Sequence, residues 1–224
     1  MRVLIVIPAY NEEEVISQVI VDVRQQLKTA DILVVDDGST DQTGEEAFKA
    51  GAAVVRHVIN RGLGGAIGTG IEYSRGKDYT AVATIDADGQ HDANDLLKVL
   101  QPIFEGRADV VIGSRLLQDV FQVPIDRRLL IRLSNLLTFI LFGFKSTDTL
   151  SGFRAFSRKA LEKIELKTET MEVSNELFGE ISRHQLRYLE VPIRVRYTPY
   201  SRTKGQTNLN ALNVGIKLLL RLAR

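Results

Sequence analysis

The sequence contains no cysteine. Disulfide frameworks, thiolate catalysis and cysteine-ligated zinc sites are therefore excluded, and the absence suits a reducing, intracellular setting. Histidine is scarce, with only His57, His91 and His184. His91 lies beside the acidic cluster described below, but a single histidine beside carboxylates is more often structural or substrate-facing than a metal ligand. We therefore assign it no role.

Long apolar runs are also missing. The most apolar segment, 129–144, is interrupted by Arg132, Ser134, Asn135 and Thr138, whereas a spanning helix needs about 20 predominantly apolar residues. The first eight residues lead directly into Asn-Glu-Glu-Glu, which does not resemble a signal peptide. Repeats, low-complexity segments and Gly/Pro/Ser-rich linkers are absent. We expect one domain, 1–224, that does not span a membrane.

The net charge of +1 conceals a strongly basic end. Residues 183–224 contain nine Lys or Arg and a single acid, Glu190. Such a segment favours phosphate or an anionic membrane surface over nucleic acid as its partner, and the alternative is a solvated basic helix without a specific role.

Short β-branched runs alternate with helical patterns in the first half of the chain. Strands are predicted at 3–7, 32–35, 52–55, 81–85 and 110–112, and amphipathic helices at 12–27 and 93–104. This alternation predicts an α/β fold with a mainly parallel central sheet and helices on both faces.

The second half is less regular. Helices are predicted at 125–144 and 171–184, strands at 151–156, 188–191 and 193–197, and a final amphipathic helix at 209–222. A soft boundary near Gly113 would separate a nucleotide-binding half, 1–113, from an acceptor-binding half, 114–224.

Polar clusters follow each of the first four predicted strands, at 8–12, 36–41, 60–65 and 86–91. Ligands of open parallel sheets bind beyond the carboxyl ends of the strands. The sequence therefore predicts one binding site built from these four clusters.

The fourth cluster has two carboxylates two residues apart, Asp86 and Asp88. Residues i and i+2 of an extended chain point to the same side, so both can face one cation, with the Gln90 carbonyl as a third oxygen ligand. Magnesium or manganese suits such oxygen ligands better than zinc. The alternative is a plain turn at Asp88-Gly89, which the position after a strand disfavours.

The second and third clusters offer further contacts. Adjacent Asp36 and Asp37 cost stability unless they are compensated, so we expect one of them to face ligand, and Asp41 to cap the following helix. The glycine-rich stretch 60–70 lets backbone amides approach a ligand, with Arg61 supplying charge; the alternative is a helix start packed on the sheet. The stretch gives little support for NAD binding, because it does not follow the first strand.

Together these motifs resemble glycosyltransferase family 2, and particularly its dolichol-phosphate mannosyltransferases and polyprenyl-phosphate glycosyltransferases. The resemblance covers nearly the whole chain and rests on residues 8–12, 34–40, 60–66, 86–91, 113–115, 151–156 and 201–205. Members often continue into transmembrane helices, whereas this sequence ends at Arg224.

The resemblance implies a GT-A fold and inverting transfer from a nucleotide-diphosphate sugar, GDP-mannose or a UDP-hexose. The nucleotide sugar would contact Pro8, Tyr10, Glu12, Asp37, Arg61, Gly62, Asp86, Arg202 and Lys204. The Mg²⁺ or Mn²⁺ ion would bind Asp86, Asp88 and Gln90. Arg115 and Arg154 would meet the acceptor phosphate, and Asp88 and Arg115 would be the catalytic pair.

The expected acceptor is a polyprenyl or dolichyl phosphate at the cytoplasmic face of a membrane, with the protein bound peripherally; a homo-oligomer is one option for its assembly. A metal and fixed arginines would stabilise the departing diphosphate, and an ionised acceptor needs no general base. A hydroxyl acceptor would need one, for which Asp148, Glu172 and Glu176 are candidates.

The predicted helix 125–144 suits a membrane interface, because it is largely apolar and begins with Arg127, Arg128 and Arg132. A buried core or dimer helix is the alternative. Two other functions stay open: a sugar-phosphate nucleotidyltransferase, which should carry a basic glycine-rich motif after the first strand, and a non-catalytic nucleotide-sugar-binding or scaffold protein.

Overall fold

The computed structural model describes residues 1–118, 120, 123–168, 173–197 and 200. Its centre is a seven-stranded sheet in the order β3-β2-β1-β4-β6-β5-β7. β6 runs antiparallel to β4 and β5, and the other paired strands are parallel, as the alternating sequence pattern predicted. The strands are β1 Val3–Ala9, β2 Asp31–Asp36, β3 Ala53–Arg56, β4 Ala81–Thr84, β5 Val110–Ser114, β6 Arg154–Ser157 and β7 Tyr188–Pro192.

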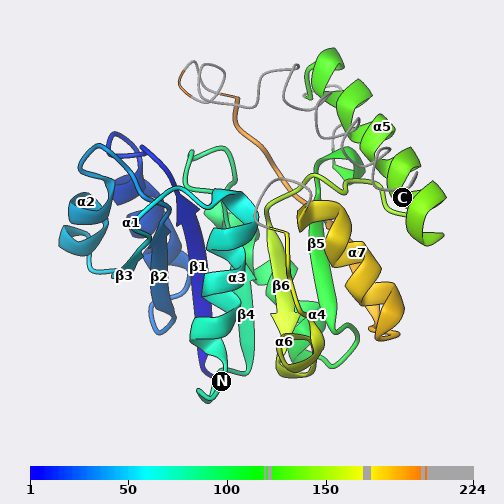
Figure 1. Ribbon diagram of the computed structural model, residues 1–224, viewed down its shortest axis with the longest axis horizontal. Coiled ribbons are helices and arrows are strands. Elements are labelled where there is room, and N and C mark those ends of the chain that lie inside the picture. Colours follow the sequence, from blue (N-terminus) through cyan, green and yellow to red (C-terminus); the bar gives the residue numbers. More distant parts are fainter. Residues whose placement is uncertain (119, 121–122, 169–172, 198–199, 201–224) are drawn as a thin grey trace.

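Helices cover both faces of this sheet, again as predicted (Figure 1). They are α1 Ile16–Gln26, α2 Thr43–Lys49, α3 Gly62–Ser74, η1 Ala93–Asp95, α4 Leu96–Phe104, η2 Arg115–Leu117, α5 Ile125–Phe142, α6 Arg158–Lys163 and α7 Val173–Arg183. Buried apolar side chains of α1 and α4 form a core on one face, and those of α3, α6 and α7 form a second core on the other.

The central strand β1 shows why the sheet lies inside the protein. All seven of its residues are buried, with Ile5 in one core and Leu4 and Val6 in the other. Parallel strands buried on both faces are apolar throughout instead of alternating. Because β1 pairs with β2 and β4, the loops after these three strands meet at the same edge.

Two predicted elements differ from the structure in their bounds. α1 begins at Ile16 instead of residue 12: Asn11 has a positive φ of 55°, which a helix does not allow, and the Glu12 amide bonds to the Thr43 hydroxyl. The predicted strand 193–197 is wrong: β7 ends at Pro192, and only Val195 makes an isolated bridge, to His91.

Helix α5 has its apolar side outward. Its buried residues are Ile131, Ser134 and Thr138, two of them polar. Its exposed large hydrophobic residues are Ile125, Leu129, Leu133, Leu136, Phe139 and Ile140, which are 44–68% exposed. The alternative of a buried core helix is therefore wrong.

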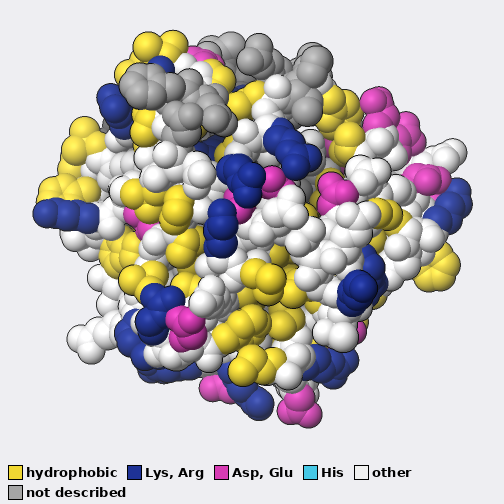
Figure 2. Space-filling model, turned by 180° about the vertical axis from the view of Figure 1, so that it is seen from behind, with side chains coloured by type: hydrophobic (Ala, Val, Ile, Leu, Met, Phe, Trp, Pro, Cys, Tyr) yellow, Lys and Arg dark blue, Asp and Glu magenta, His cyan; other side chains and the backbone are white. Residues whose placement is uncertain are grey.

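This helix ends at Gly143, in the left-handed conformation with φ 65°, two residues before Lys145. It lies beyond the carboxyl edge of the sheet (Figure 1). Seen from behind, apolar side chains gather at the same end of the molecule, next to basic ones (Figure 2). Within the described residues, no helix is both long and apolar enough to cross a bilayer. The predicted helix 209–222 lies outside them.

Candidate active site

The two acidic residues of the fourth cluster follow β4 at the carboxyl edge of the sheet. β4 ends at Thr84, and residues 87–88 form a turn in which Gly89 has a φ of 70°. The extended geometry expected for this segment is therefore wrong. Asp86 and Asp88 still lie close enough for the charge of one to affect the other, and both are partly exposed.

Asp86 is held by two neighbours. His91 Nε2 lies 2.9 Å from its Oδ2, and the His91 ring is fixed in turn by the Phe153 ring, whose centroid is 5.2 Å away. Gly152 lies directly under the carboxylate, since a Cβ there would be 2.6 Å from Asp86 Cγ. Burial opposes ionisation of Asp86, but His91, Arg154 and Arg115 outweigh it and hold its pKa below the usual value.

Asp88 is oriented by Gln90, whose backbone amide and side-chain Nε2 donate to its two carboxylate oxygens at 3.0 Å and 2.6 Å. Burial, and then the charge of Asp86, raise the pKa of Asp88. The Gln90 carbonyl, predicted as a metal ligand, accepts a hydrogen bond from the Arg196 amide at 2.8 Å. This carbonyl oxygen therefore already accepts one hydrogen bond.

This arrangement fits a divalent cation whose ligands come partly from the protein and partly from a bound diphosphate. Two neighbouring carboxylates supply hard oxygen ligands, and burial together with the charge of Asp86 raises the pKa of Asp88, so a cation would relieve both effects. No group of three or more His, Cys, Asp or Glu that could hold a metal occurs among the described residues. Mg²⁺ typically binds through one or two carboxylates plus substrate phosphates.

Arg115, at the end of β5, is fixed by a buried carboxylate. Its Nε and Nη2 each donate to Asp148 at 2.7 Å, and its backbone amide donates to the same group at 3.0 Å. Burial would lower the pKa of Arg115, but the charge and hydrogen bonds of Asp148 raise it. Arg115 therefore keeps a permanent positive charge in a fixed position beside Asp86.

Arg154, the first residue of β6, is only 1% exposed. Its Nε and Nη2 donate to the Ser151 carbonyl and the Ser174 hydroxyl at 2.7 Å and 2.8 Å. Burial lowers its pKa to about 10, which leaves it charged at neutral pH. The structure thus places Arg154 as a buried charge acting on Asp86 from within, and direct contact with an acceptor phosphate stays a prediction.

The clusters after β2 and β3 are joined by Asp37. Its carboxylate accepts from the Arg61 and Gly62 amides at 2.9 Å and 2.7 Å, and from His57 Nδ1 at 2.6 Å. His57 Nε2 in turn lies 2.9 Å from the Thr69 hydroxyl of α3. Asp37 therefore organises the start of α3, and its contact with a nucleoside stays a prediction.

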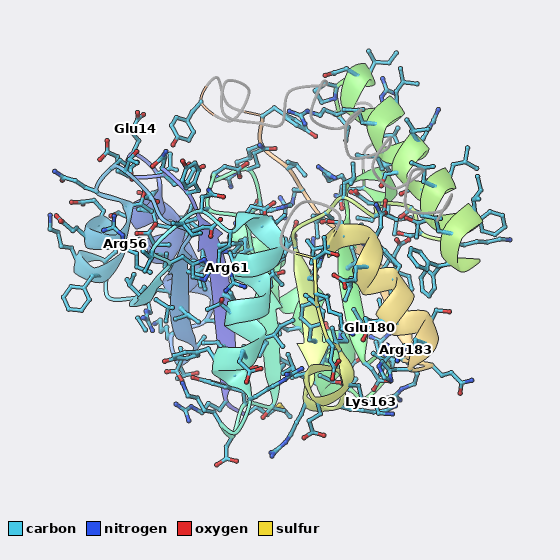
Figure 3. All side chains as sticks on the ribbon, viewed as in Figure 1. Glu14, Arg56, Arg61, Lys163, Glu180 and Arg183 are labelled. Carbon is cyan, nitrogen blue, oxygen red and sulfur yellow. The ribbon has the colours of Figure 1, made fainter. Side chains whose placement is uncertain are left out.

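Other predicted residues of these clusters have definite positions. Asp36 accepts from the Ser39 amide at 2.9 Å and lies 3.4 Å from Arg56. Asp41 accepts from the Thr43 amide at 3.0 Å, but the N-cap position of α2 is Gln42, so Asp41 supports the start of this helix from one residue before the cap. The Arg61 side chain lies alongside α3, over Gly65 (Figure 3).

The cluster after β1 is at the same edge. Pro8 is buried in β1, whereas Tyr10 is 45% exposed. Glu12 accepts a hydrogen bond from the Tyr200 hydroxyl at 2.7 Å. Arg202 and Lys204, predicted to meet donor phosphates, lie outside the described residues.

Sequence reasoning missed three contributors to the site. His91 orients Asp86, Gly152 makes room for it, and Asp148 pairs with Arg115 instead of serving as a free base. Only His91 gave a sequence signal, its place in the Asp86 loop. The other two contacts join residues 33 or more positions apart in the chain.

Comparison with known proteins identifies the family. Residues 4–165 match the family described as Glycosyl transferase family 2. The UDP-N-acetylglucosamine–dolichyl-phosphate N-acetylglucosaminyltransferase of Methanococcus voltae is 34% identical over 98% of this chain and 94% of its own length. The undecaprenyl-phosphate mannosyltransferase of Micrococcus luteus is 32% identical over 96% of this chain and 90% of its own length.

A solved structure supports the fold. Glucosyl-3-phosphoglycerate synthase from Mycobacterium tuberculosis, crystallised with Mn²⁺, UDP and phosphoglyceric acid, superposes with a TM-score of 0.65. It is 21% identical, and the similarity covers 97% of this chain and 78% of that chain. The predicted GT-A architecture is thereby confirmed. The chain belongs to glycosyltransferase family 2 and is an enzyme of that family.

Proposed function

We propose that this enzyme transfers a sugar, with inversion, from a nucleotide-diphosphate sugar to a polyprenyl or dolichyl phosphate at the surface of a membrane. The observation that carries the proposal is the pair Asp86 and Asp88, held at the carboxyl edge of the sheet beside the fixed charge of Arg115 and the buried charge of Arg154. The two curated relatives, whose names state lipid-phosphate acceptors, support it.

The donor side needs stabilisation of negative charge. When the bond from the anomeric carbon to the diphosphate breaks, the departing oxygen becomes anionic, and positive groups held in place stabilise it most. A bound Mg²⁺ or Mn²⁺ would neutralise the diphosphate, with Asp86 and Asp88 as its protein ligands. His91 and Gly152 hold Asp86, and Gln90 holds Asp88, so the ligands are oriented in advance.

The acceptor side favours an oxygen that is already ionised. A hydroxyl acceptor would need a general base. Asp148 is fully buried with both oxygens bound to Arg115. The Glu176 carboxylate accepts the Lys167 and Thr168 amides at 2.9 Å and 2.8 Å, and Glu172 lies outside the described residues. A phosphate acceptor would need none of these groups as a base.

The membrane surface is supported by α5, whose outer face exposes apolar side chains such as Leu129, Leu136 and Ile140. Arg132 is exposed on the same side of the helix, and the Lys145 ammonium lies 5.9 Å from the centre of the Phe139 ring, so both could meet anionic headgroups. The face lies at the carboxyl edge, the same edge as the site (Figure 1). A lipid phosphate could then reach the site while its chain stays in the bilayer. This placement supports peripheral binding at a membrane surface, which we propose to be the cytoplasmic face.

The two other candidate functions have less support. A nucleotidyltransferase would carry a basic glycine-rich loop after β1, where this chain has Pro8 to Glu12. A non-catalytic binder would have no need for oriented metal ligands. A hydroxyl-acceptor transferase is disfavoured by the engagement of Asp148 and Glu176.

The test begins with the donor. Thermal shifts with GDP-mannose, UDP-glucose and UDP-N-acetylglucosamine, each with and without Mg²⁺ or Mn²⁺, should identify a donor that stabilises the fold. That donor is then incubated with polyprenyl phosphate in detergent or with a soluble hydroxyl acceptor. Metal-dependent product from the lipid phosphate, with inverted anomeric configuration by NMR, is expected. Product from the hydroxyl acceptor alone contradicts the proposal.

A matched pair of variants tests the acidic site. Asp88→Asn should reduce transfer at least about a hundredfold, because one hard ligand is lost, with an unchanged melting temperature. Asp78→Asn, at a side chain 95% exposed, is the control and should transfer like wild type. Full turnover by Asp88→Asn would remove the metal role from this residue.

A further inference from the structure

Two side chains of α5 hold the loop that fixes Arg115: Ser134 bonds to the Thr149 hydroxyl at 2.8 Å, and Asn135 bonds to the backbone on both sides of Asp148. Asn135 Nδ2 donates to the Thr147 carbonyl at 2.7 Å, and its Oδ1 accepts from the Thr149 amide at 3.0 Å and from the Thr149 hydroxyl at 3.0 Å. A single carboxamide thus binds the backbone on both sides of Asp148. Few side chains besides Asn and Gln can donate and accept in this way at once.

Asp148 connects this anchored loop to Arg115. Its two oxygens accept from Arg115 Nε and Nη2, and one of them also accepts from the Arg115 backbone amide. A bidentate pair fixes both the position and the plane of the guanidinium group. Moving the 147–149 backbone therefore moves the Arg115 side chain, because Asp148 is fully buried and has no solvent into which it can turn.

The loop has a second anchor, on the sheet. Glu190 of β7 accepts from the Thr147 amide and hydroxyl at 2.8 Å and 2.7 Å, and Ser114 of β5 lies 2.6 Å from the same hydroxyl. The loop therefore lies between a rigid sheet and α5. Of these two supports, α5 is the one whose outer face is apolar and exposed.

We infer that Asn135 is a positioning residue. When α5 binds to a lipid surface, Asn135 fixes the position of the Asp148 loop and thereby orients the Arg115 guanidinium group toward the acceptor phosphate. This deepens the proposed function and rests on it. Leu136, next to Asn135, and Leu133, two residues before it, face outward and would insert at the interface. The Asn135 amide faces inward and transmits the position of the helix to the Asp148 loop.

Kinetics provide the first test. Asn135→Ala should raise the KM for polyprenyl phosphate about tenfold, the effect of losing about one to two hydrogen bonds, while the KM for the donor stays the same. Thr138→Val is the matched control: it removes another inward bond of α5, from Thr138 to Asn175 at 2.7 Å, but does not touch the 147–149 loop. It should leave both KM values unchanged.

A double variant separates positioning from general damage. If Asn135 acts through Arg115, Asn135→Ala should have less than about a twofold further effect in the Arg115→Lys background, because coupled residues are not additive. Full additivity, or equal loss in Asn135→Ala and Thr138→Val, would show that Asn135 is only structural.

Hydrogen exchange tests the lipid step without any substrate. The Arg115 amide should lose protection in Asn135→Ala but not in Thr138→Val. Vesicles of phosphatidylcholine with phosphatidylglycerol should increase its protection in wild type and not in Asn135→Ala. Three outcomes would each overturn the inference. The protein binds vesicles without this change in protection, it does not bind vesicles, or the protection rises with protein concentration because α5 pairs between two copies of the chain.

These readouts keep the two proposals apart. If wild type transfers no sugar to polyprenyl phosphate, the proposed function fails, and the exchange of the Arg115 amide still decides whether α5 controls this residue. If transfer occurs but the exchange pattern is absent, only the positioning role of Asn135 is lost.

Discussion

Gly152 gives the sharpest test of the acidic site, because its hydrogen atoms face the Asp86 carboxylate. A Cβ at this position would lie 2.6 Å from Asp86 Cγ, whereas non-bonded carbon atoms approach to about 3.5 Å. Gly152→Ala therefore requires a displacement of about 1 Å. The end of the Asp86 side chain is the part that can yield, because Gly152 itself is fixed by the bond from the Thr84 hydroxyl to its carbonyl at 2.7 Å.

The displacement should affect activity more than stability. Turning the Asp86 carboxylate breaks its 2.9 Å contact with His91 and misplaces a metal ligand. A misplacement of about 1 Å in a catalytic arrangement costs about a hundredfold in rate, equivalent to about 2.7 kcal/mol of transition-state stabilisation. The loss of stability should be smaller, since a partly exposed side chain can rotate toward solvent.

The assay is metal-dependent transfer from the identified donor, with Mn²⁺ titrated to measure its apparent affinity. Gly152→Ala should lower kcat/KM about a hundredfold and weaken the response to Mn²⁺. Gly68→Ala is the control, because no heavy atom lies within 4 Å of the added Cβ and alanine favours the α3 interior by about 1 kcal/mol. Turnover of Gly152→Ala within about threefold of wild type would refute the placement of Asp86 over Gly152.

Two further predictions concern stability and the membrane. Asp109 accepts from Arg187 Nη2 at 2.8 Å and from Lys159 at 3.1 Å, and the Arg187 hydrogen bonds lower its pKa despite burial. Because the folded pKa is lowered, this stabilisation is complete above about pH 4, the ordinary aspartate value, and is lost as the pH falls below it. Asp109→Asn should therefore cost about 2 kcal/mol in urea unfolding at pH 7 and clearly less at pH 3; an equal cost at both would contradict the pairing. Leu136→Glu, at a side chain 53% exposed on α5, should reduce flotation with anionic vesicles, whereas Leu97→Glu, 50% exposed on α4, should not.

The sheet could be predicted from the sequence because the pattern that identifies each strand lies within a short segment of the chain. A strand buried on both faces, such as β1, is apolar at nearly every position, and the amphipathic helices show their own period. The end of α1 that borders the site could not be placed. There the Glu12 amide bonds to Thr43, and this contact with a distant residue overrides a helical pattern that is continuous in the sequence.

The site could be predicted in part for the same reason. The acidic pair lies within one loop, and its residue types identify oxygen ligands without knowledge of the fold. The roles of the arginines depend on residues far away: Arg115 has its carboxylate partner 33 positions later, and Arg154 is enclosed by Ser151 and by Ser174 of α7. The sequence shows a positive charge at these positions but not whether it faces solvent or the interior.

The structure divides the positive charge of the site between two arginines with different surroundings. Arg154 is sealed in the protein and can act on the site only through its field, so it should stabilise the acidic pair whether or not a ligand is bound. Arg115 is 14% exposed at its side chain and lies at the surface side of the same charges. Its partner Asp148 occupies Nε and Nη2, and the Tyr197 hydroxyl also lies close enough to interact with the guanidinium group. An acceptor phosphate would therefore meet one arginine held in a single orientation, which explains why the loop that holds Asp148 needs support from both the sheet and α5.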